Sequence, residues 1–272
     1  MDESVAAVAP PLRAPEPAPA ALEPMAKRIM RWVDVALIFA IFIVLELAIA
    51  PGAAHAVYNL ANRIGPGMER YPLPALIQIG AQEGLILLVI FCFVLLRGLS
   101  FADLGFRKTS FFWILAGMAA LIVALPIRLC LGVAAHFAIG GTLETIAGAA
   151  DENAFPLIDS PALAGLPAVL MVGVVAPLVE ELIFRAILYV KLRQRLGVMW
   201  ATIISSLIFG VIHSSVAMGV SAAVMGVVLA WLYEKSRSLW LPLLLHIVNN
   251  TALFLFLVFV VGIQEIAGFP GF

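Results

Sequence analysis

The sequence predicts an all-α fold, a polytopic transmembrane helical bundle of about seven spans. Hydrophobic residues make up 63% of the 272-residue chain and charged residues only 12%, with a mean hydropathy of +1.09. A soluble domain is typically about half apolar and a quarter charged. Apolar runs long enough to cross a bilayer recur along the chain. Together these observations predict an integral membrane protein whose main surroundings are the lipid bilayer.

Residues 1–26 form a Pro/Ala-rich segment without apolar periodicity, which predicts a disordered cytoplasmic tail. The segment does not resemble a signal peptide, because the first apolar run begins only after Lys27, Arg28 and Arg31 and no small-residue cleavage site follows it.

Seven apolar runs follow, with boundaries uncertain by about 2–4 residues. Residues 27–159 hold the N-terminal transmembrane helices, 160–263 a motif-bearing helical core, and 264–272 a short C-terminal tail. The fourth run is long, which indicates a tilted helix or a break near Pro177. The predicted spans are 32–50, 76–96, 111–135, 162–190, 198–213, 216–233 and 239–263.

The distribution of Lys and Arg predicts the orientation of the bundle. With seven spans, thirteen of the sixteen basic residues fall on the side of the N-terminus. Arg63 and Arg70 fall on the other side, and Arg128 lies inside a span, where Glu83 is its expected partner. Because basic residues concentrate in cytoplasmic loops, the pattern predicts a cytoplasmic N-terminus.

Two other classes of function receive no support from composition. The net charge of −1 gives no reason to expect a nucleic-acid partner. Cys92 and Cys130 both lie in apolar runs, so they indicate buried thiols and not a disulfide framework or a CxxC metal site.

The fourth run carries Glu180, Glu181 and Arg185 in an apolar setting where charge is costly. On a helix, Glu181 and Arg185 lie one turn apart on one face and are expected to form an ion pair. Glu180 points about 100° away from that face. The pattern therefore predicts one structural carboxylate, Glu181, and one free to act, Glu180.

Two later runs add polar side chains. Phe209 and His213 stand four residues apart in the fifth run, and His246 and Asn250 stand four apart in the seventh. A carboxylate and an imidazole can together take a proton from a water molecule that attacks a carbonyl. A second imidazole and an amide can donate hydrogen bonds to the resulting oxyanion. The set is therefore typical of a hydrolytic site.

Other interpretations stay open at this point. An ion pair, an interhelical histidine or an asparagine is more often structural than catalytic in a membrane bundle. Zinc is the competing chemistry, since Glu180, His213 and His246 are a set of zinc-ligating types. The sequence lacks His-Glu-x-x-His, however, so no cofactor is favoured.

The three motifs Glu180-Glu181-x-x-x-Arg185, Phe209-x-x-x-His213 and His246-x-x-x-Asn250 resemble those of the CPBP intramembrane proteases. This family, also called Abi, includes the type II CAAX prenyl endopeptidases. The resemblance covers about residues 160–255 and includes the connecting segment 226–242.

The resemblance implies roles for these residues. Glu180 and His213 would activate the attacking water, His246 and Asn250 would stabilise the oxyanion, and Glu181, Arg185 and Phe209 would support them. The implied function is an intramembrane endopeptidase that acts on a membrane-associated or lipidated, CAAX-type peptide. The alternative is a non-catalytic immunity or scaffold protein, or a proton-coupled carrier, built on the same fold.

Overall fold

The computed structural model describes residues 31–45, 72–142, 169–213 and 215–267, with single positions or pairs between 52 and 65 and at 145 and 167. Every regular element in this described part is helical, so the all-α prediction is confirmed there. The elements are α2 (Trp32–Val44), α4 (Pro72–Arg97), α5 (Phe111–Ala138), η4 (Val169–Val175), α8 (Ala176–Glu181), η5 (Leu182–Tyr189), α9 (Val190–Val211), α10 (Val216–Ser236) and α11 (Trp240–Ala267).

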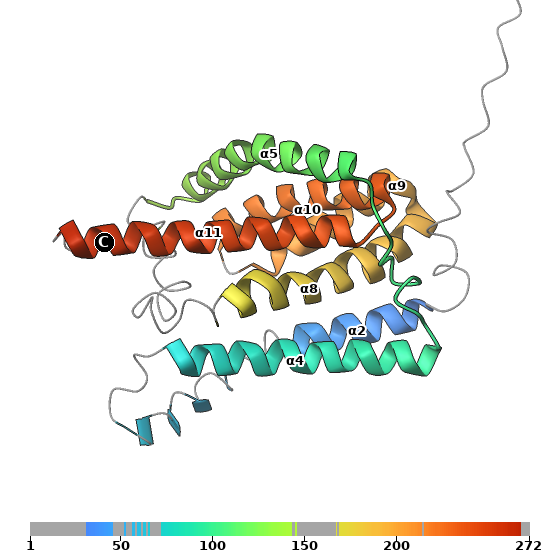
Figure 1. The fold of residues 1–272 in the computed structure, drawn as a ribbon, viewed down its shortest axis with the longest axis horizontal. Coiled ribbons are helices and arrows are strands. Elements are labelled where there is room, and N and C mark those ends of the chain that lie inside the picture. Colours follow the sequence, from blue (N-terminus) through green and yellow to red (C-terminus); the bar gives the residue numbers. More distant parts are fainter. Residues whose placement is uncertain are drawn as a thin grey trace, which may run out of the picture.

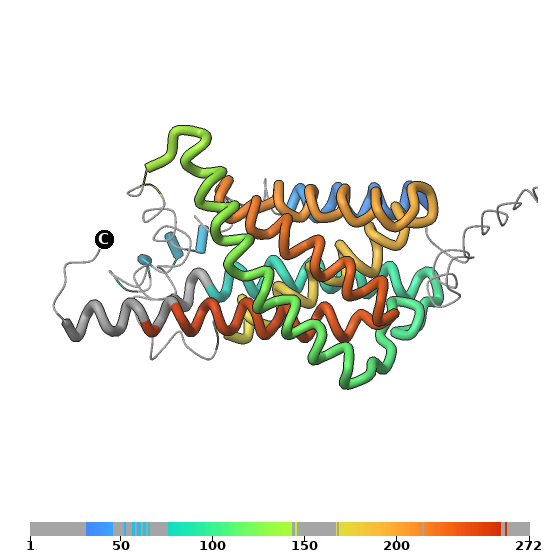
Figure 2. Tube along the Cα trace, turned by 90° about the horizontal axis from the view of Figure 1, so that it is seen from above, coloured from blue at the N-terminus to red at the C-terminus, as the bar shows by residue number. Residues whose placement is uncertain are grey.

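The helix that carries the two glutamates lies in the middle of the bundle. Figure 1 shows α8 between α2 and α4 on one side and α5, α10 and α11 on the other. The packing agrees, because η4 contacts both α4 and α11, and η5 contacts both α2 and α10. In Figure 2, α5 runs across α10 and α11. The charged motif is therefore enclosed by helices from both halves of the chain.

Three of the described helical segments are long and apolar enough to cross a membrane: Leu76–Arg97, Phe111–Ala138 and Val216–Ser236. Two shorter apolar helices, Trp32–Ile43 and Trp240–Phe256, accompany them. Large apolar side chains such as Leu96 and Phe111 are exposed on these helices, where lipid would solvate them. The chain is an integral membrane protein, while the number of seven spans stays a prediction.

The central helix continues past Pro177. The predicted alternative of a break at this proline is therefore wrong. Wide π-type helical turns, η4 and η5, precede and follow α8. Pro177 follows the π-type turns of η4, and such local adjustments accommodate the missing N–H of a proline inside a membrane helix. The chain departs from helical geometry further on, at Gly197 in α9, whose φ is 77°. The π-type turns of η4 and η5 are of a kind that is frequent at functional sites.

Two close approaches between helices require residues without a side chain. A Cβ atom on Gly173 of η4 would lie 2.5 Å from Thr251 Oγ1 of α11. A Cβ atom on Gly132 of α5 would lie 2.6 Å from the carbonyl oxygen of Ala217 in α10. Both distances are shorter than any van der Waals contact, so glycine lets η4 and α5 pack directly against their neighbours.

Several contacts between helices gather at one end of the bundle, and two of them involve basic residues that are predicted to share one side of the membrane. Arg97 at the end of α4 forms an ion pair with Asp34 at the start of α2. Lys191 Nζ lies 5.7 Å from the centre of the Trp32 ring. The N–H of Leu239 donates to the carbonyl of Gly105 at 2.7 Å, which ties the α4–α5 connection to the start of α11. Which membrane face this end occupies stays a prediction.

Some predictions fall on residues outside the described part of the chain. These are the tail at 1–26, most of the connection between residues 137 and 161, and residues 268–272. The helix α11 continues to Ala267, so the first residues of the predicted C-terminal tail are helical.

Candidate functional site

Glu181 forms the buried centre of the candidate site. Its side chain is fully buried, and its Oε1 atom lies 3.0 Å from Arg185 Nη1, one turn along the chain. The predicted pairing of Arg185 with Glu181 is therefore confirmed. The same oxygen lies 2.8 Å from His246 Nδ1 of α11. One carboxylate thus joins the central helix to the last helix of the bundle.

Phe209 fills the space beside these charges. The guanidinium carbon of Arg185 lies 4.7 Å from the centre of its ring, a cation–π contact in a desolvated setting. The ring also makes edge contacts with His213 and His246, at centroid distances of 5.0 and 5.9 Å. Phe209 is only 1% exposed. It separates the two histidines and orients both.

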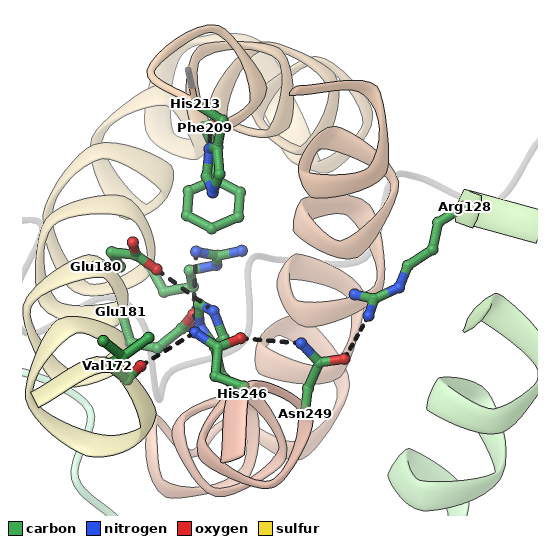
Figure 3. A network of polar contacts seen from close by, with 10 residues as sticks. Arg128, Val172, Glu180, Glu181, Phe209, His213, His246 and Asn249 are labelled. Atoms are coloured by element: carbon green, nitrogen blue, oxygen red, sulfur yellow. Dashed lines mark hydrogen bonds and ion pairs between the residues drawn. The ribbon is translucent and has the colours of Figure 1, made fainter. Parts of the chain in front are cut away.

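Glu180 is less buried than Glu181, with 20% of its side chain exposed. Its Oε2 atom lies 3.4 Å from His246 Nε2. The sequence predicts that Glu180 has no charged partner, because the cation on the same helix pairs with Glu181. The structure corrects this, because α11 brings an imidazole to Glu180 across the bundle (Figure 3).

His246 therefore stands between two carboxylates, one at each ring nitrogen. An ionised carboxylate only accepts hydrogen bonds, so a ring that donates to both carries two protons and a positive charge. The net charge of Glu180, Glu181, Arg185 and His246 is then zero. It is equally zero when the proton near Nε2 resides on Glu180. The Nε2 atom of His246 lies 3.4 Å from Glu180 Oε2, without a hydrogen bond between them in the described part of the chain.

His213 enters the site from the end of α9. Its Nδ1 atom lies 2.8 Å from the carbonyl oxygen of Phe209. Because a carbonyl only accepts, Nδ1 carries the proton, and Nε2 of the neutral ring is a free base. Within the described part of the chain, no hydrogen bond joins His213 to Glu180. Figure 3 shows both side chains directed into the space that the helices enclose.

Asn250 lies one turn beyond His246 on α11. Its Nδ2 donates to the carbonyl of Val172 in η4, at 3.4 Å. Its Oδ1 accepts from Asn249 Nδ2 at 2.9 Å. Asn249 Oδ1 in turn accepts from Arg128 Nη2 of α5 at 2.6 Å. This chain of contacts was not predicted from the sequence, which assigned Arg128 to Glu83 and overlooked Asn249.

Whether Glu180, His213 and His246 bind zinc stays a prediction. Among the described residues, no group of three or more His, Cys, Asp or Glu side chains is arranged to hold a metal ion. His246 Nδ1 contacts Glu181, and its Nε2 lies 3.4 Å from Glu180 Oε2.

Comparisons with known proteins agree on the segment that carries the site. A family model described as type II CAAX prenyl endopeptidase Rce1-like matches residues 162–252. A Bacillus subtilis (strain 168) protein named "Putative membrane peptidase YdiL" is 31% identical over 117 residues, which are 42% of this chain and 47% of YdiL. The alignment thus covers about half the length of that relative. No solved structure matches the chain significantly.

The matched segment contains Glu180, Glu181, Arg185, Phe209, His213, His246 and Asn250. In the structure, Glu180, Glu181, Phe209, His213 and His246 come together from the central helix, α9 and α11 (Figure 3). Residues 162–252 are therefore similar to the Rce1-like type II CAAX prenyl endopeptidases, which supports the predicted resemblance to the CPBP family.

Proposed function

We propose that the protein is an intramembrane endopeptidase in which Glu180 activates water. The observation that carries the proposal is the position of Glu180, a partly exposed carboxylate whose Oε2 lies 3.4 Å from His246 Nε2. Behind it, Glu181 Oε1 contacts both Arg185 and His246. In the proposed reaction, Glu180 is the carboxylate that meets the substrate, and His246 carries a proton on Nε2.

In this reaction, Glu180 takes a proton from a water molecule as the water oxygen bonds to the scissile carbonyl carbon. Nε2 of His213 is a free acceptor and would orient that water. The carbonyl oxygen becomes an oxyanion, which accepts hydrogen bonds from His246 Nε2–H and Asn250 Nδ2–H. When the carbon–nitrogen bond breaks, Glu180 returns the proton to the leaving amine. No metal takes part in these steps.

The proposed substrate is a membrane-associated or lipidated peptide, with prenylated CAAX-type peptides as the first class to test. The matched family is named for such an activity. The outer faces of α4 and α5 are apolar, so a substrate carrying a lipid group would share the protein's membrane environment.

The test is peptide cleavage by the purified protein in nanodiscs, with a farnesylated CAAX peptide and mass spectrometry as the readout. Wild type, Glu180→Gln and wild type with a zinc chelator are compared. We expect cleavage that is lost in Glu180→Gln and kept with the chelator. Loss with the chelator would favour zinc chemistry, and equal cleavage by Glu180→Gln would exclude the role given to Glu180.

A matched control comes from Glu234, a buried glutamate bound by Arg193 and Tyr189 away from the site. Glu234→Gln makes the same chemical change as Glu180→Gln. It should lower stability but leave kcat per folded molecule unchanged. If it abolished turnover as fully as Glu180→Gln, the loss would report on folding and not on catalysis.

A further inference from the structure

Arg128 is a buried cation that lies outside the segment matched to the family. It stands in the middle of α5 and is only 6% exposed. Its Nη2 donates to Asn249 Oδ1 at 2.6 Å, and its Nε atom has no hydrogen-bond partner within the described part of the chain. A buried arginine in a membrane helix is costly, so this one is expected to serve a purpose.

The contact determines the orientation of two amide groups in series. A guanidinium only donates, so the Asn249 amide must present its oxygen to Arg128. Its Nδ2 then faces away and donates to Asn250 Oδ1 at 2.9 Å. With its oxygen engaged, Asn250 presents Nδ2–H groups on its other side. The charge of Arg128 thus decides that Asn250 offers donors, and not an acceptor, to the site.

The Nδ2 group of Asn250, the last donor of this series, makes only a long hydrogen bond within the protein. Asn250 Nδ2 lies 3.4 Å from the carbonyl of Val172, longer than the usual 2.7–3.2 Å of such a bond. A stronger acceptor, such as an oxyanion, can therefore displace this contact. An oxyanion site needs N–H groups whose direction is fixed before the reaction, because reorientation during the reaction is costly.

We propose that Arg128 is a positioning residue that fixes the donor orientation of Asn250 through Asn249. The proposal rests on the proposed function for the role of Asn250 in catalysis. The position of α5 does not depend on Arg128 alone. Gly132, one turn along, packs α5 directly against Ala217 of α10. Substitution of Arg128 is therefore expected to change the amides without releasing the helix.

Asn249→Asp gives the sharpest test, because the introduced carboxylate keeps the shape of the side chain and still accepts from Arg128. A carboxylate cannot donate to Asn250, so the Asn250 amide should turn and direct its oxygen into the site. We expect kcat to fall at least about tenfold, since loss of one oxyanion donor lowers kcat by roughly 10²–10³. KM and the melting temperature should change little.

Substitutions at Arg128 separate charge from packing. Arg128→Lys keeps a donor-only cation and should retain most of the wild-type kcat. Arg128→Met removes the donor and should lower kcat as Asn249→Asp does. In an Asn250→Ala background, neither Arg128→Met nor Asn249→Asp should lower kcat further, because both act through Asn250. Additive losses in that background would overturn the proposal. Arg97→Met, which removes a distant arginine, should leave kcat unchanged.

A measurement that does not depend on cleavage tests the proposal without knowledge of the substrate. The chain has five asparagines, so side-chain ¹⁵N-asparagine spectra of the protein in nanodiscs are sparse. Asn250→Ala identifies the Asn250 amide signal. That signal should shift in Arg128→Met and Asn249→Asp and stay in place in Arg128→Lys and Arg97→Met. An unshifted signal overturns the proposal, whereas shifted signals without cleavage by wild type would count against the proposed function alone.

Discussion

His246 Nδ1 lies 2.8 Å from Glu181 Oε1, and this contact connects the last helix of the bundle to the central one. The accepting oxygen also faces Arg185 at 3.0 Å. Because Glu181 is fully buried, its position is fixed by packing as well as by charge. The contact determines which nitrogen of His246 faces Glu180. Glu181 therefore orients the imidazole of His246 through its Nδ1 atom.

Glu181→Gln should damage both stability and catalysis. The amide keeps the shape of the side chain but leaves Arg185 without its anion in a buried site. Removal of one partner of a buried ion pair typically costs about 3–5 kcal/mol. We expect a lower melting temperature in detergent and a reduced kcat, because His246 loses its orientation.

Comparison with Glu180→Gln tells the two glutamates apart. Glu180 is partly exposed and lies farther from His246, so Glu180→Gln should abolish cleavage with little loss of stability. If Glu181→Gln left the melting temperature unchanged, the buried ion pair would not have the structural role given to it.

Arg185→Lys should lower the thermal stability, although the positive charge is kept. Lysine keeps the positive charge near Glu181, but it lacks the planar group that lies over the Phe209 ring at 4.7 Å. A desolvated cation–π contact contributes about 2 kcal/mol. We expect thermal stability in the order wild type, Arg185→Lys, Arg185→Met. Equal melting temperatures for wild type and Arg185→Lys would show that the stacking contributes nothing.

The sequence contained enough information to find the members of the site but not their contacts. The pairing of Glu181 with Arg185 follows from helix periodicity, since the two residues are one turn apart. The contacts of His246 join residues 65 positions apart and depend on how α11 is placed along α8. No local pattern specifies that placement. For this reason the sequence could not show that the imidazole of His246 lies beside Glu180, the carboxylate predicted to be free.

The same limit applies to the backbone and to Asn250. The apolar runs predicted helices in the described regions, but the wide turns before and after α8 have no recognisable pattern in the sequence. Asn249 stands beside a predicted site residue, yet its importance depends on Arg128, which α5 brings from 121 positions away. The signal in the sequence that could have pointed to Asn249 is the pair of adjacent asparagines in the seventh run.

Tyr189→Phe should weaken the end of the bundle without affecting catalysis. The Tyr189 hydroxyl donates to Glu234 Oε2 at 2.9 Å, and Arg193 holds both oxygens of the same carboxylate at 2.7 and 2.8 Å. A hydrogen bond to a charged group contributes about 1.5–3 kcal/mol. The melting temperature should fall while kcat and KM stay constant. A changed kcat would mean that this end of the bundle is coupled to the site.

Gly173→Ala should disturb the contact between η4 and α11 that places Val172 beside Asn250. The new methyl group would lie 2.5 Å from Thr251 Oγ1, and overpacking of this kind costs about 1–3 kcal/mol. The other nearby atoms of Thr251 would lie at 3.6 Å, which is an ordinary contact distance.

Removal of the hydroxyl should therefore restore the fit. In the double variant Gly173→Ala with Thr251→Ala, the melting temperature and kcat should return towards the wild-type values, although Thr251→Ala alone gains nothing. Measurement of all four proteins gives the coupling between the two positions. Additive losses would mean that η4 shifts away from α11 as a whole, because a local clash with one oxygen atom would be relieved when that atom is removed.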